Sequence, residues 1–570
     1  MESPQTPRSF RSFMSAPPAP FGVVVGLVFW WWSLTPTLLP RAWMIQAAVS
    51  ALSIAVGYGI GSAIGAGIRW ISRRLDWSGL SGSHRRLAWL LAGAAVIVLL
   101  AGSAVLWFGW QNEQRDLVSM DHLAMWNTAA MVGLAAVLTV VLIMIGRLIG
   151  YGIYRLNGFL ARWMPTAIRV IAIGVLVVVV SVVLAQDVVA KGFIGWANST
   201  YGASNTGSDP GVVQPTSQFV SGGQDSLISW ESLGWQGRTF TAGATKVSDL
   251  DAFAGPGSDP AEPIRVYAGL RSADTDPERA ALVVQELERT GAGDREIVVV
   301  AGTTGTGFID PDAATAIEYI HNGDTAIAGM QYSYLPSWIS FMADKEKAAA
   351  SAAVIYQAVT AWWSQLPEAG RPRLIVFGES LGSYGSESSI NGTSVEASMR
   401  RIVEGTDGVL WAGPTEPNPV WGQLIGAREP GTPVWRPVYD GETMARVANT
   451  TDEINADDGG WAVPRVLHLH HPSDPVGYWT WDTLWKRPDW TREPIGYDVS
   501  PRVAWYPFVT FWQVVADLMA GFDAPAGYGH NYSPHLARAW TAVAPADGWT
   551  AADTARLEAH LIAIVPSESG

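Results

Sequence analysis

The sequence predicts an N-terminal α-helical transmembrane bundle of about five spans, followed by an α/β domain with a mostly parallel sheet and helices on both faces. Two patterns indicate this. The first third holds long apolar stretches with few charges, and residues beyond 262 alternate short β-branched runs with amphipathic helical patterns. The mean hydropathy of +0.15 is high for a soluble chain. We therefore expect a transmembrane domain (1–190), a linker with a docking segment (191–262) and an α/β domain (263–570).

Five apolar stretches lie in the first third, each near the ~20 residues that a helix needs to cross a bilayer. They cover residues 21–41, 43–68, 87–110, 124–146 and 163–186. The first is less regular, because Pro36 and Pro40 interrupt its second half, and it could be kinked or partly re-entrant. Whether this stretch crosses the bilayer decides the orientation of everything that follows it.

Arginine residues gather in alternate loops between the apolar stretches, and loops that face the cytoplasm carry an excess of Lys and Arg. The arginine-rich segments precede the first stretch, follow the second and follow the fourth. They contain Arg8, Arg11, Arg69, Arg73, Arg74, Arg85, Arg86, Arg147, Arg155, Arg162 and Arg169. With five crossings and a cytoplasmic N-terminus, the chain beyond about residue 190 lies outside. We therefore predict a multi-pass protein of the cytoplasmic membrane, with the lipid bilayer as a partner and an extracytoplasmic α/β domain.

The net charge of −14 is unevenly distributed along the chain. Residues 1–195 hold 14 Lys and Arg against 6 Asp and Glu, a net charge of +8, whereas the remainder carries −22. An acidic C-terminal part argues against nucleic acid as a partner, because phosphate binding requires clustered cations. The chain has no cysteine, which excludes disulfides, thiolate metal sites and cysteine nucleophiles. These patterns do not indicate an oligomeric state.

A segment rich in Ser, Thr, Gly, Asn and Asp connects the two parts, as expected for a linker. Trp230, Leu233 and Trp235 within it are too apolar for a free tether, so we expect them to dock on a neighbouring surface. The predicted strands beyond it are 263–270, 296–302, 325–334, 373–378, 408–413 and 465–471. Ligands of parallel sheets bind beyond the carboxyl ends of the strands, so the chemistry is expected there.

Ser380 lies in the pentapeptide Gly378-Glu-Ser-Leu-Gly382, directly after a predicted strand. G-x-S-x-G on a strand-to-helix turn is a nucleophile elbow, in which the glycines leave room for a strained serine whose Oγ projects above the sheet. The pattern alone recurs by chance in a Gly-rich chain, and the alternative is an ordinary turn. Its position directly after the run RLIVF favours a nucleophile.

A serine hydroxyl needs a base, and the elbow architecture places serine, acid and histidine in that order along the chain. Three of the nine histidines follow a plausible acid-bearing strand. His530 lies in a loop before a helical pattern, where a catalytic imidazole is usually presented, whereas His535 stands at a helix start and His560 lies within a helical pattern. We therefore predict that His530 is the base.

Asp474 is the predicted acid, because it follows the strand 465–471 within a turn that contains Pro and Ser. An ordinary turn-forming role is the alternative for this residue. Asp482 and Glu493 are the other candidates for the acid, since they also lie between the predicted strand and His530.

The HLHH run before Asp474 also invites interpretation as a metal site. His468 and His470 project from the same face of the predicted strand, as two ligands of one ion would. No nearby carboxylate pattern completes a zinc site, however, and buried or pocket-lining histidines are commoner. Neither a metal nor a cofactor is therefore expected.

Acyl transfer at such a serine also needs backbone N–H groups that stabilise the oxyanion. One comes from the residue after the serine, Leu381, and the other from the Gly-rich loop 301–311, where Thr303 or Thr304 is the expected donor. The glycines of that loop would let its amides turn toward a ligand. A Gly-rich turn could instead hold a phosphate, but this loop lacks the Lys-Ser/Thr ending of a P-loop.

Several runs together carry a resemblance to a known family. They are SLTPTLLPR in the first apolar stretch, then PIRVYAGL, ERAALVVQELERTGAGDR, TGTGFIDP, GDTAIAGMQYSYLPSW, RPRLIVFGESLGSYG, LWAGP and HHPSDPV. Over nearly its whole length, the chain resembles a family of actinobacterial membrane proteins that carry an α/β-hydrolase domain. The resemblance implies this fold and a serine hydrolase triad, here Ser380, Asp474 and His530. The loop 301–311 has TTGTG where many esterases have HGGG, and the resemblance implies no settled substrate.

These observations favour a membrane-anchored serine hydrolase or acyltransferase that acts on acyl esters, such as lipid or cell-envelope esters, at the outer face of the membrane. Ser380 would form the acyl-enzyme, with His530 as base and Asp474 orienting the imidazole. One alternative is a transporter or channel with a regulatory, non-catalytic hydrolase-like domain, although the apolar stretches hold few charges. Another is a binding module with an inactive elbow, although all three triad positions are filled. Whether water or an alcohol resolves the acyl-enzyme cannot be read from these residues.

Tryptophan is dense between residues 478 and 490, just after the predicted acid. Trp prefers the headgroup region of a bilayer, and Lys486 and Arg487 could meet anionic headgroups. We expect this stretch, in particular Trp481 and Trp485, to help deliver an acyl chain from the membrane to Ser380. The alternative is ordinary packing over the sheet.

Overall fold

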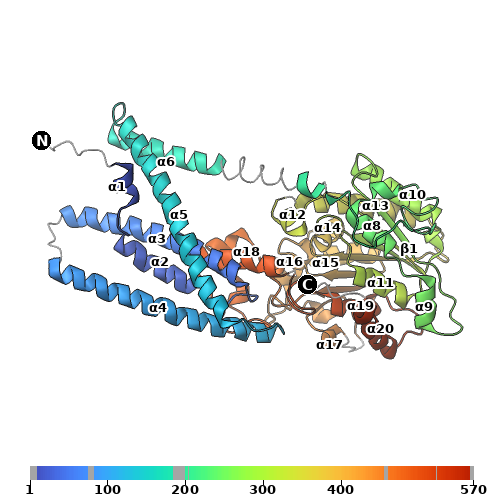
Figure 1. Ribbon diagram of the computed structural model, residues 1–570. Helices are drawn as coiled ribbons and strands as arrows, with labels where there is room; N and C mark the ends of the chain where they lie inside the picture. Colours follow the sequence, from blue (N-terminus) through green and yellow to red (C-terminus); the bar gives the residue numbers. More distant parts are fainter. Residues whose placement is uncertain are drawn as a thin grey trace. The chain divides into compact units, whose positions relative to one another are not determined.

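The computed structural model of the protein describes residues 9–74, 82–183, 199–202, 204–343, 345–454, 460–521 and 523–564. Its contacts divide the chain into two compact units (Figure 1). The helical unit consists of Met1–Phe193, Trp481–Thr491 and Val499–Ala520, and the α/β unit of Ile194–Thr480, Arg492–Asp498 and Gly521–Gly570. This division differs from the predicted domains, because two segments near residues 481–520 group with the N-terminal third of the chain.

The helical unit is built from a short first helix, five helices that overlap the five apolar stretches of the sequence, and most of one later helix. They are α1 (Phe10–Met14), α2 (Pro20–Ser33), α3 (Trp43–Arg74), α4 (Gly82–Leu117), α5 (Met125–Leu160) and α6 (Thr166–Val183), joined by most of α18 (Val509–Gly521). The end of the fifth stretch, residues 184–186, and the first linker residues, 191–198, lie outside the described residues.

Two helices in the described part of the chain are long and apolar enough to cross a membrane, Trp43–Ser72 and Met125–Leu160. Shorter apolar helices cover Pro20–Ser33, Thr166–Val177 and Val509–Gly521. A bundle of five spans is therefore not confirmed and stays a prediction.

Helix α2 ends at Ser33, before the prolines that interrupt the first apolar stretch. Its 14 residues are about 21 Å long, shorter than the ~30 Å hydrocarbon core. Helices α2 and α3 approach closely, since a Cβ at Gly61 would lie 2.2 Å from the carbonyl oxygen of Phe21. Small residues at such contacts are typical of helix packing in membranes.

The α/β unit is organised around a sheet of seven strands in the order β1-β3-β2-β4-β5-β7-β6. They are β1 (Ile264–Ala268), β2 (Ile297–Gly302), β3 (Thr325–Met330), β4 (Arg373–Glu379), β5 (Gly408–Ala412), β6 (Ala445–Ala448) and β7 (Arg465–Leu469). Every neighbouring pair is parallel, which confirms the predicted parallel sheet. Strand β6, an edge strand of four residues, was not among the predicted strands.

Helices cover both faces of the sheet, because successive side chains of each strand point to opposite sides. The ring of Phe377 lies 5.5 Å from that of Trp540, whereas its neighbour Val376 joins a separate core cluster with Trp411. One group of contacting helices contains α10 (Asp276–Arg289), α13 (Lys345–Trp363), α14 (Leu381–Ile390), α15 (Val395–Gly405) and α16 (Pro419–Ala427). The group on the other face contains α11 (Pro311–Ile320), α19 (Ser533–Val543) and α20 (Ala551–Ile564) (Figure 1).

The remaining helices and turns in the described part of the chain are short. They are α8 (Gly234–Ala242), α9 (Val247–Ala254), α12 (Ser337–Ala343), α17 (Thr451–Ile454) and six 3₁₀ turns, η2 (Trp230–Ser232), η3 (Ala292–Asp294), η4 (Asp440–Glu442), η5 (Pro475–Gly477), η6 (Trp481–Leu484, within the helical unit) and η7 (Asp489–Thr491, also within the helical unit). In the segment expected to dock, Leu233 is buried and belongs to the main core cluster, with Trp230 packed against that cluster. The carbonyl oxygen of Leu233 would lie 2.4 Å from a Cβ at Gly269, just after β1.

Candidate active site

Ser380 occupies the sharp turn between β4 and α14. Its backbone has φ 53° and ψ −124°, a combination that costs energy for any residue with a side chain. The Ser380 N–H donates to the carbonyl oxygen of Ala412 at the end of β5, 2.9 Å away. The turn is therefore strained and held in place by the neighbouring strand, as expected for a nucleophile elbow.

The glycines around Ser380 are required by close backbone contacts. A Cβ at Gly378 would lie 2.5 Å from the carbonyl oxygen of Gly382, and a Cβ at Gly382 would lie 2.1 Å from that of Gly302. Real Cβ atoms do not approach backbone oxygens so closely, because the atoms would overlap. Glycine at these three positions thus allows the start of α14 to rest against the ends of β2 and β4.

Asp474 and His530 are joined by a hydrogen bond, although 56 residues separate them in the chain. His530 Nδ1 lies 2.7 Å from Asp474 Oδ2, and both side chains are buried. Asp474 also accepts from the hydroxyl of Tyr532 at 2.8 Å and from the N–H of Val476 at 2.9 Å. Burial alone would raise the pKa of the Asp474 carboxyl, but the charge and hydrogen bond of His530 bring that pKa below its ordinary value.

The His530 ring lies beside the end of β5, the strand that accepts a hydrogen bond from the Ser380 backbone. A Cβ at Gly413 would be 2.6 Å from His530 Cε1, and the residue before Gly413, Ala412, accepts the Ser380 N–H. The His530 N–H donates to the carbonyl oxygen of Gly521 at 3.0 Å, which fixes the backbone of the loop. The structure thus brings Ser380, His530 and Asp474 together at the carboxyl ends of β4, β5 and β7.

The other predicted acids and bases have different surroundings. Glu493 binds Arg428 and accepts the Val434 N–H, and Asp482 is exposed in the helical unit. His560 Nε2 lies 3.0 Å from the hydroxyl of Tyr319. His535 bonds to Thr451 and His471. Of the three acids considered, Asp474 alone contacts a histidine within the described residues.

The two strand histidines of the HLHH run contact separate partners. His468 Nε2 lies 3.1 Å from Glu387 Oε1, and His470 Nε2 lies 3.0 Å from the hydroxyl of Tyr478. Burial lowers the pKa of His470 to about 4, so this ring is neutral near pH 7. In the part of the chain that the structure describes, no group of three side chains is arranged to hold a metal ion.

The backbone amides predicted for the oxyanion differ in their availability. Leu381 is the first residue of α14, so its N–H has no acceptor within the helix. The Thr304 N–H donates to the carbonyl oxygen of Phe308 at 3.0 Å. The Thr303 N–H has no backbone acceptor among the described residues, and its hydroxyl donates to the Met330 carbonyl oxygen at 2.7 Å. The geometry therefore favours Thr303 over Thr304.

Two features of the candidate site were not predicted from the sequence. Tyr532, two residues after His530, donates to Asp474 and stacks on His471 with ring centroids 4.3 Å apart. Burial raises the pKa of the Glu379 carboxyl well above its ordinary value, and nearby Asp310 raises it further. The position of Glu379 at the end of a buried strand was the one signal available in the sequence.

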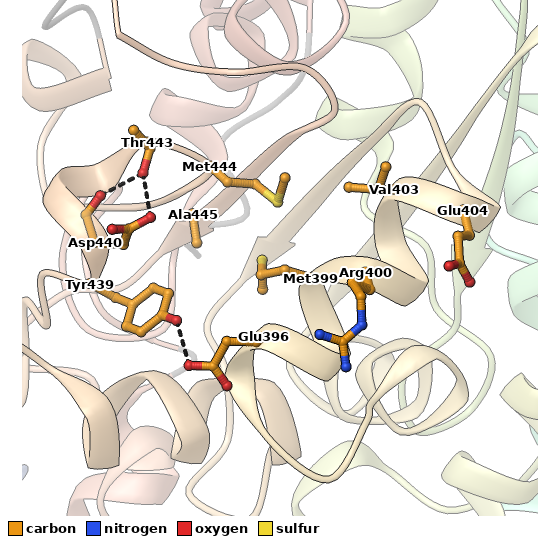
Figure 2. A pocket seen from close by; sticks show the side chains of 10 residues that line it. All are labelled: Glu396, Met399, Arg400, Val403, Glu404, Tyr439, Asp440, Thr443, Met444 and Ala445. Atoms are coloured by element: carbon orange, nitrogen blue, oxygen red, sulfur yellow. Dashed lines mark hydrogen bonds between the residues drawn. The ribbon is translucent and has the colours of Figure 1, made fainter.

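A cavity of about 340 Å³ lies elsewhere on the α/β unit (Figure 2). Its lining comes from α15, from the start of β6 and from the η4 segment before that strand, where the Tyr439 hydroxyl donates to Glu396 at 2.8 Å. Because all strands are parallel, the start of β6 lies at the amino ends of the strands, opposite the carboxyl ends where Ser380 lies. None of the predicted site residues lines this cavity.

Comparison with known proteins matches the chain to two family models. The model described as the alpha/beta-hydrolase family matches residues 264–557, and the model of the N-terminus of that family matches residues 34–244. The first range contains Ser380, Asp474, His530 and both amide-bearing segments. No curated protein and no solved structure gives a significant match.

Proposed function

Because the chain belongs to the alpha/beta-hydrolase family, we propose that it is a membrane-anchored serine hydrolase or acyltransferase that acts on acyl esters. Family membership supports hydrolase chemistry in general. The single observation that carries the serine mechanism is the 2.7 Å contact of His530 with Asp474 beside the strained Ser380. This combination of nucleophile, base and orienting acid is the arrangement of serine triads on several unrelated folds.

In the proposed first step, Ser380 Oγ attacks the ester carbonyl while His530 Nε2 takes the hydroxyl proton. Asp474 Oδ2 accepts from His530 Nδ1, so the neutral ring carries its proton on Nδ1 and leaves Nε2 basic. The tetrahedral intermediate then collapses to an acyl-enzyme, and His530 returns the proton to the departing alcohol. Water or a second alcohol completes the cycle by the reverse sequence.

Charge that develops on the carbonyl oxygen needs donors that are already in position. We assign this role to the Leu381 N–H and the Thr303 N–H. The close contacts among Gly302, Gly378 and Gly382 support the assignment, because they hold the end of β2 against the start of α14. Removal of one such donor typically costs about 10²–10³ in kcat.

The membrane part of the proposal rests on the helical unit. Its long helices carry many exposed apolar side chains, for example Val137, Val140 and Ile149 of α5, and such side chains suit a lipid environment. The proposed position of the α/β unit on the outer side of the membrane is supported by the arginine distribution of the sequence. Lipid or cell-envelope esters are accordingly the proposed substrate class.

The proposal is tested by labelling full-length protein with a fluorophosphonate probe, which reacts with activated serines. Native protein should be labelled and the Ser380→Ala variant should not. Ser389→Ala is a matched control, since Ser389 lies on the same helix and its hydroxyl bonds the Gly385 carbonyl oxygen. Labelling of Ser380→Ala at the native rate would refute the assignment of the nucleophile.

A further inference from the structure

The chain between the candidate acid and the candidate base belongs to the other structural unit. Asp474 and His530 lie in the α/β unit, whereas residues 481–491 and 499–520 between them pack with the helical unit. We call these two segments the insertion. Its placement raises the question of what the insertion contacts apart from the helices on which it packs.

The two segments of the insertion are joined to each other by local contacts. The Phe508 N–H donates to the Leu484 carbonyl oxygen at 2.9 Å, and the Trp505 indole N–H donates to the Thr483 carbonyl oxygen at 2.9 Å. The rings of Trp481 and Phe511 stack with centroids 5.2 Å apart. The 3₁₀ turn η6 and α18 therefore form one element.

A buried polar network holds α18 against the turn between α2 and α3. Arg41 Nε lies 3.1 Å from Asp517 Oδ1, and neither side chain is exposed. Gln513, one helical turn before Asp517, donates to the carbonyl oxygen of Thr35 at 3.0 Å. Residues four apart lie on the same side of a helix, so this polar side of α18 is fixed to the helical unit.

The other side of α18 is apolar and partly exposed. Trp512, Val515 and Met519 recur at the spacing of one helix face, and Met519 is 51% exposed. Trp481 and Trp485 of the adjoining turn are 60% and 65% exposed. These five side chains, which we call the Trp-rich surface, expose large apolar groups that solvent does not favour.

The bilayer is the occupant that the rest of the helical unit favours. The same compact unit contains helices of membrane-spanning length with exposed apolar side chains, so the Trp-rich surface belongs to a unit that exposes apolar side chains on several elements. Trp is enriched at the headgroup level of membranes. Lys486 and Arg487 are balanced by Asp482 and Asp489, so apolar contact should outweigh attraction to anionic headgroups.

We propose that the Trp-rich surface lies in the headgroup region of the bilayer and that the acid and base loops extend from the two ends of this lipid-bound element. Asp474 precedes Trp481 by seven residues, which span at most about 25 Å. The His530 N–H is bonded to Gly521, the last residue of α18. An ester held in the membrane is then the favoured substrate, a consequence that rests on the proposed function.

The absence of cysteine allows a direct test in the full-length chain. Trp485→Cys and Met519→Cys are each labelled with an environment-sensitive fluorophore and reconstituted in phosphatidylcholine vesicles that contain nitroxide-labelled lipid. Leu227→Cys is the matched control, since Leu227 is 54% exposed and lies in the α/β unit. Shallow nitroxides should quench both insertion labels several-fold more strongly than the control label.

Equal quenching at all three positions would overturn the proposal. Protection of the insertion labels from aqueous iodide without lipid quenching would also overturn it, and would indicate a protein partner or a second copy. Two separate positions are used so that a variant that fails to fold does not leave the question open. Quenching requires no turnover, so this result is independent of the fluorophosphonate experiment and the two proposals can fail separately.

Discussion

Asp474 receives three hydrogen bonds, and each fixes a different part of the candidate site. The bond from the Val476 N–H fixes the turn after β7. The bond from His530 Nδ1 determines which nitrogen of that ring carries the proton. The bond from the Tyr532 hydroxyl holds the loop that contains His530 against Asp474. The carboxylate is buried, so these donors replace the water that it would bind in the unfolded chain. Loss of one donor should therefore disturb the positions of the reacting atoms.

Asp474→Asn should lower kcat by up to about 10⁴-fold, because an amide at this position can donate to Nδ1 and stabilise the wrong tautomer. Asp482→Asn is the control, since that side chain is exposed in the helical unit. The measurement is steady-state hydrolysis of a short soluble ester by full-length protein. Retained activity of Asp474→Asn with loss in Asp482→Asn would show that the acid was misassigned.

Glu379 provides a pH-dependent prediction. Its pKa in the folded protein is raised, mainly by burial and further by nearby Asp310. The free energy of unfolding should therefore fall as the pH rises above the ordinary pKa of a glutamate carboxyl. Glu379→Gln keeps the shape of the neutral acid. It should therefore raise the melting temperature at pH 8 and leave it unchanged near pH 4. An equal shift at both pH values would exclude a titrating carboxyl as the cause.

That the three candidate triad residues, Ser380, Asp474 and His530, lie near one another could be expected from the sequence, because chain order and strand ends restrict them. Tyr532 and Glu379 could not, because their roles depend on which side chains are brought together across long sequence separations. The choice between Thr303 and Thr304 also needed the structure, since it depends on the bond from the Thr304 N–H to Phe308. A single sequence contains no record of such a contact.

At the scale of elements, two histidines hold the loop before α19 in place. His471 Nδ1 lies 2.9 Å from the Gly529 carbonyl oxygen, which can only accept, so His471 carries its proton on Nδ1. Its Nε2 then accepts from His535 Nε2–H at 3.0 Å, and His535 Nδ1 accepts from the Thr451 hydroxyl at 2.8 Å. Both rings are neutral in this arrangement, which agrees with the lowered pKa that burial gives to each of them.

Acid should therefore destabilise the fold before the surface carboxylates are fully protonated. Burial lowers the pKa of His471 to about 3 and that of His535 to about 4, from near 6.5 in the unfolded chain. Stability is then lost as pH falls below about 6.5, at up to about 1.4 kcal/mol per pH unit for each ring. Denaturant midpoints measured from pH 7 to pH 4 should fall less steeply for His535→Gln. An unchanged slope would contradict this origin.

The strands were largely predictable because each core strand is a short β-branched run, and the parallel order followed from the helices between them. β6 was missed, since its four residues contain an arginine and no apolar run. The end of α2 could be anticipated from Pro36 and Pro40. The packing of α18 could not, because its polar residues find their partners almost five hundred positions earlier.

At the scale of the whole molecule, the two structural units share the chain in an interleaved order. The two segments of the insertion, Trp481–Thr491 and Val499–Ala520, lie between the candidate acid and base and are separated by Arg492–Asp498, which belongs to the α/β unit. The Arg41–Asp517 ion pair is the buried link that holds it in the helical unit.

Breaking that ion pair should cost far more than breaking an exposed one. Arg41→Met leaves Asp517 as an unpaired buried charge, a change that typically costs about 3–5 kcal/mol. The double variant Arg41→Met with Asp517→Asn should recover part of the loss. Arg502→Ala is the matched control, because Arg502 pairs with Glu113 of the same unit but is 55% exposed, and it should cost less than about 1 kcal/mol. Equal costs in denaturant unfolding would contradict the role given to burial.

The central claim is that Ser380 is the nucleophile of an ester-cleaving enzyme, and locating the covalent adduct tests it most directly. Full-length protein is treated with a fluorophosphonate, digested with trypsin and sequenced by mass spectrometry. The peptide 374–400 contains Ser380 together with several other serines, so fragment ions distinguish them. The account predicts that the phosphonate is on Ser380 and is absent after His530→Ala. An adduct on another residue of this peptide, or elsewhere in the chain with Ser380 unmodified, would contradict it.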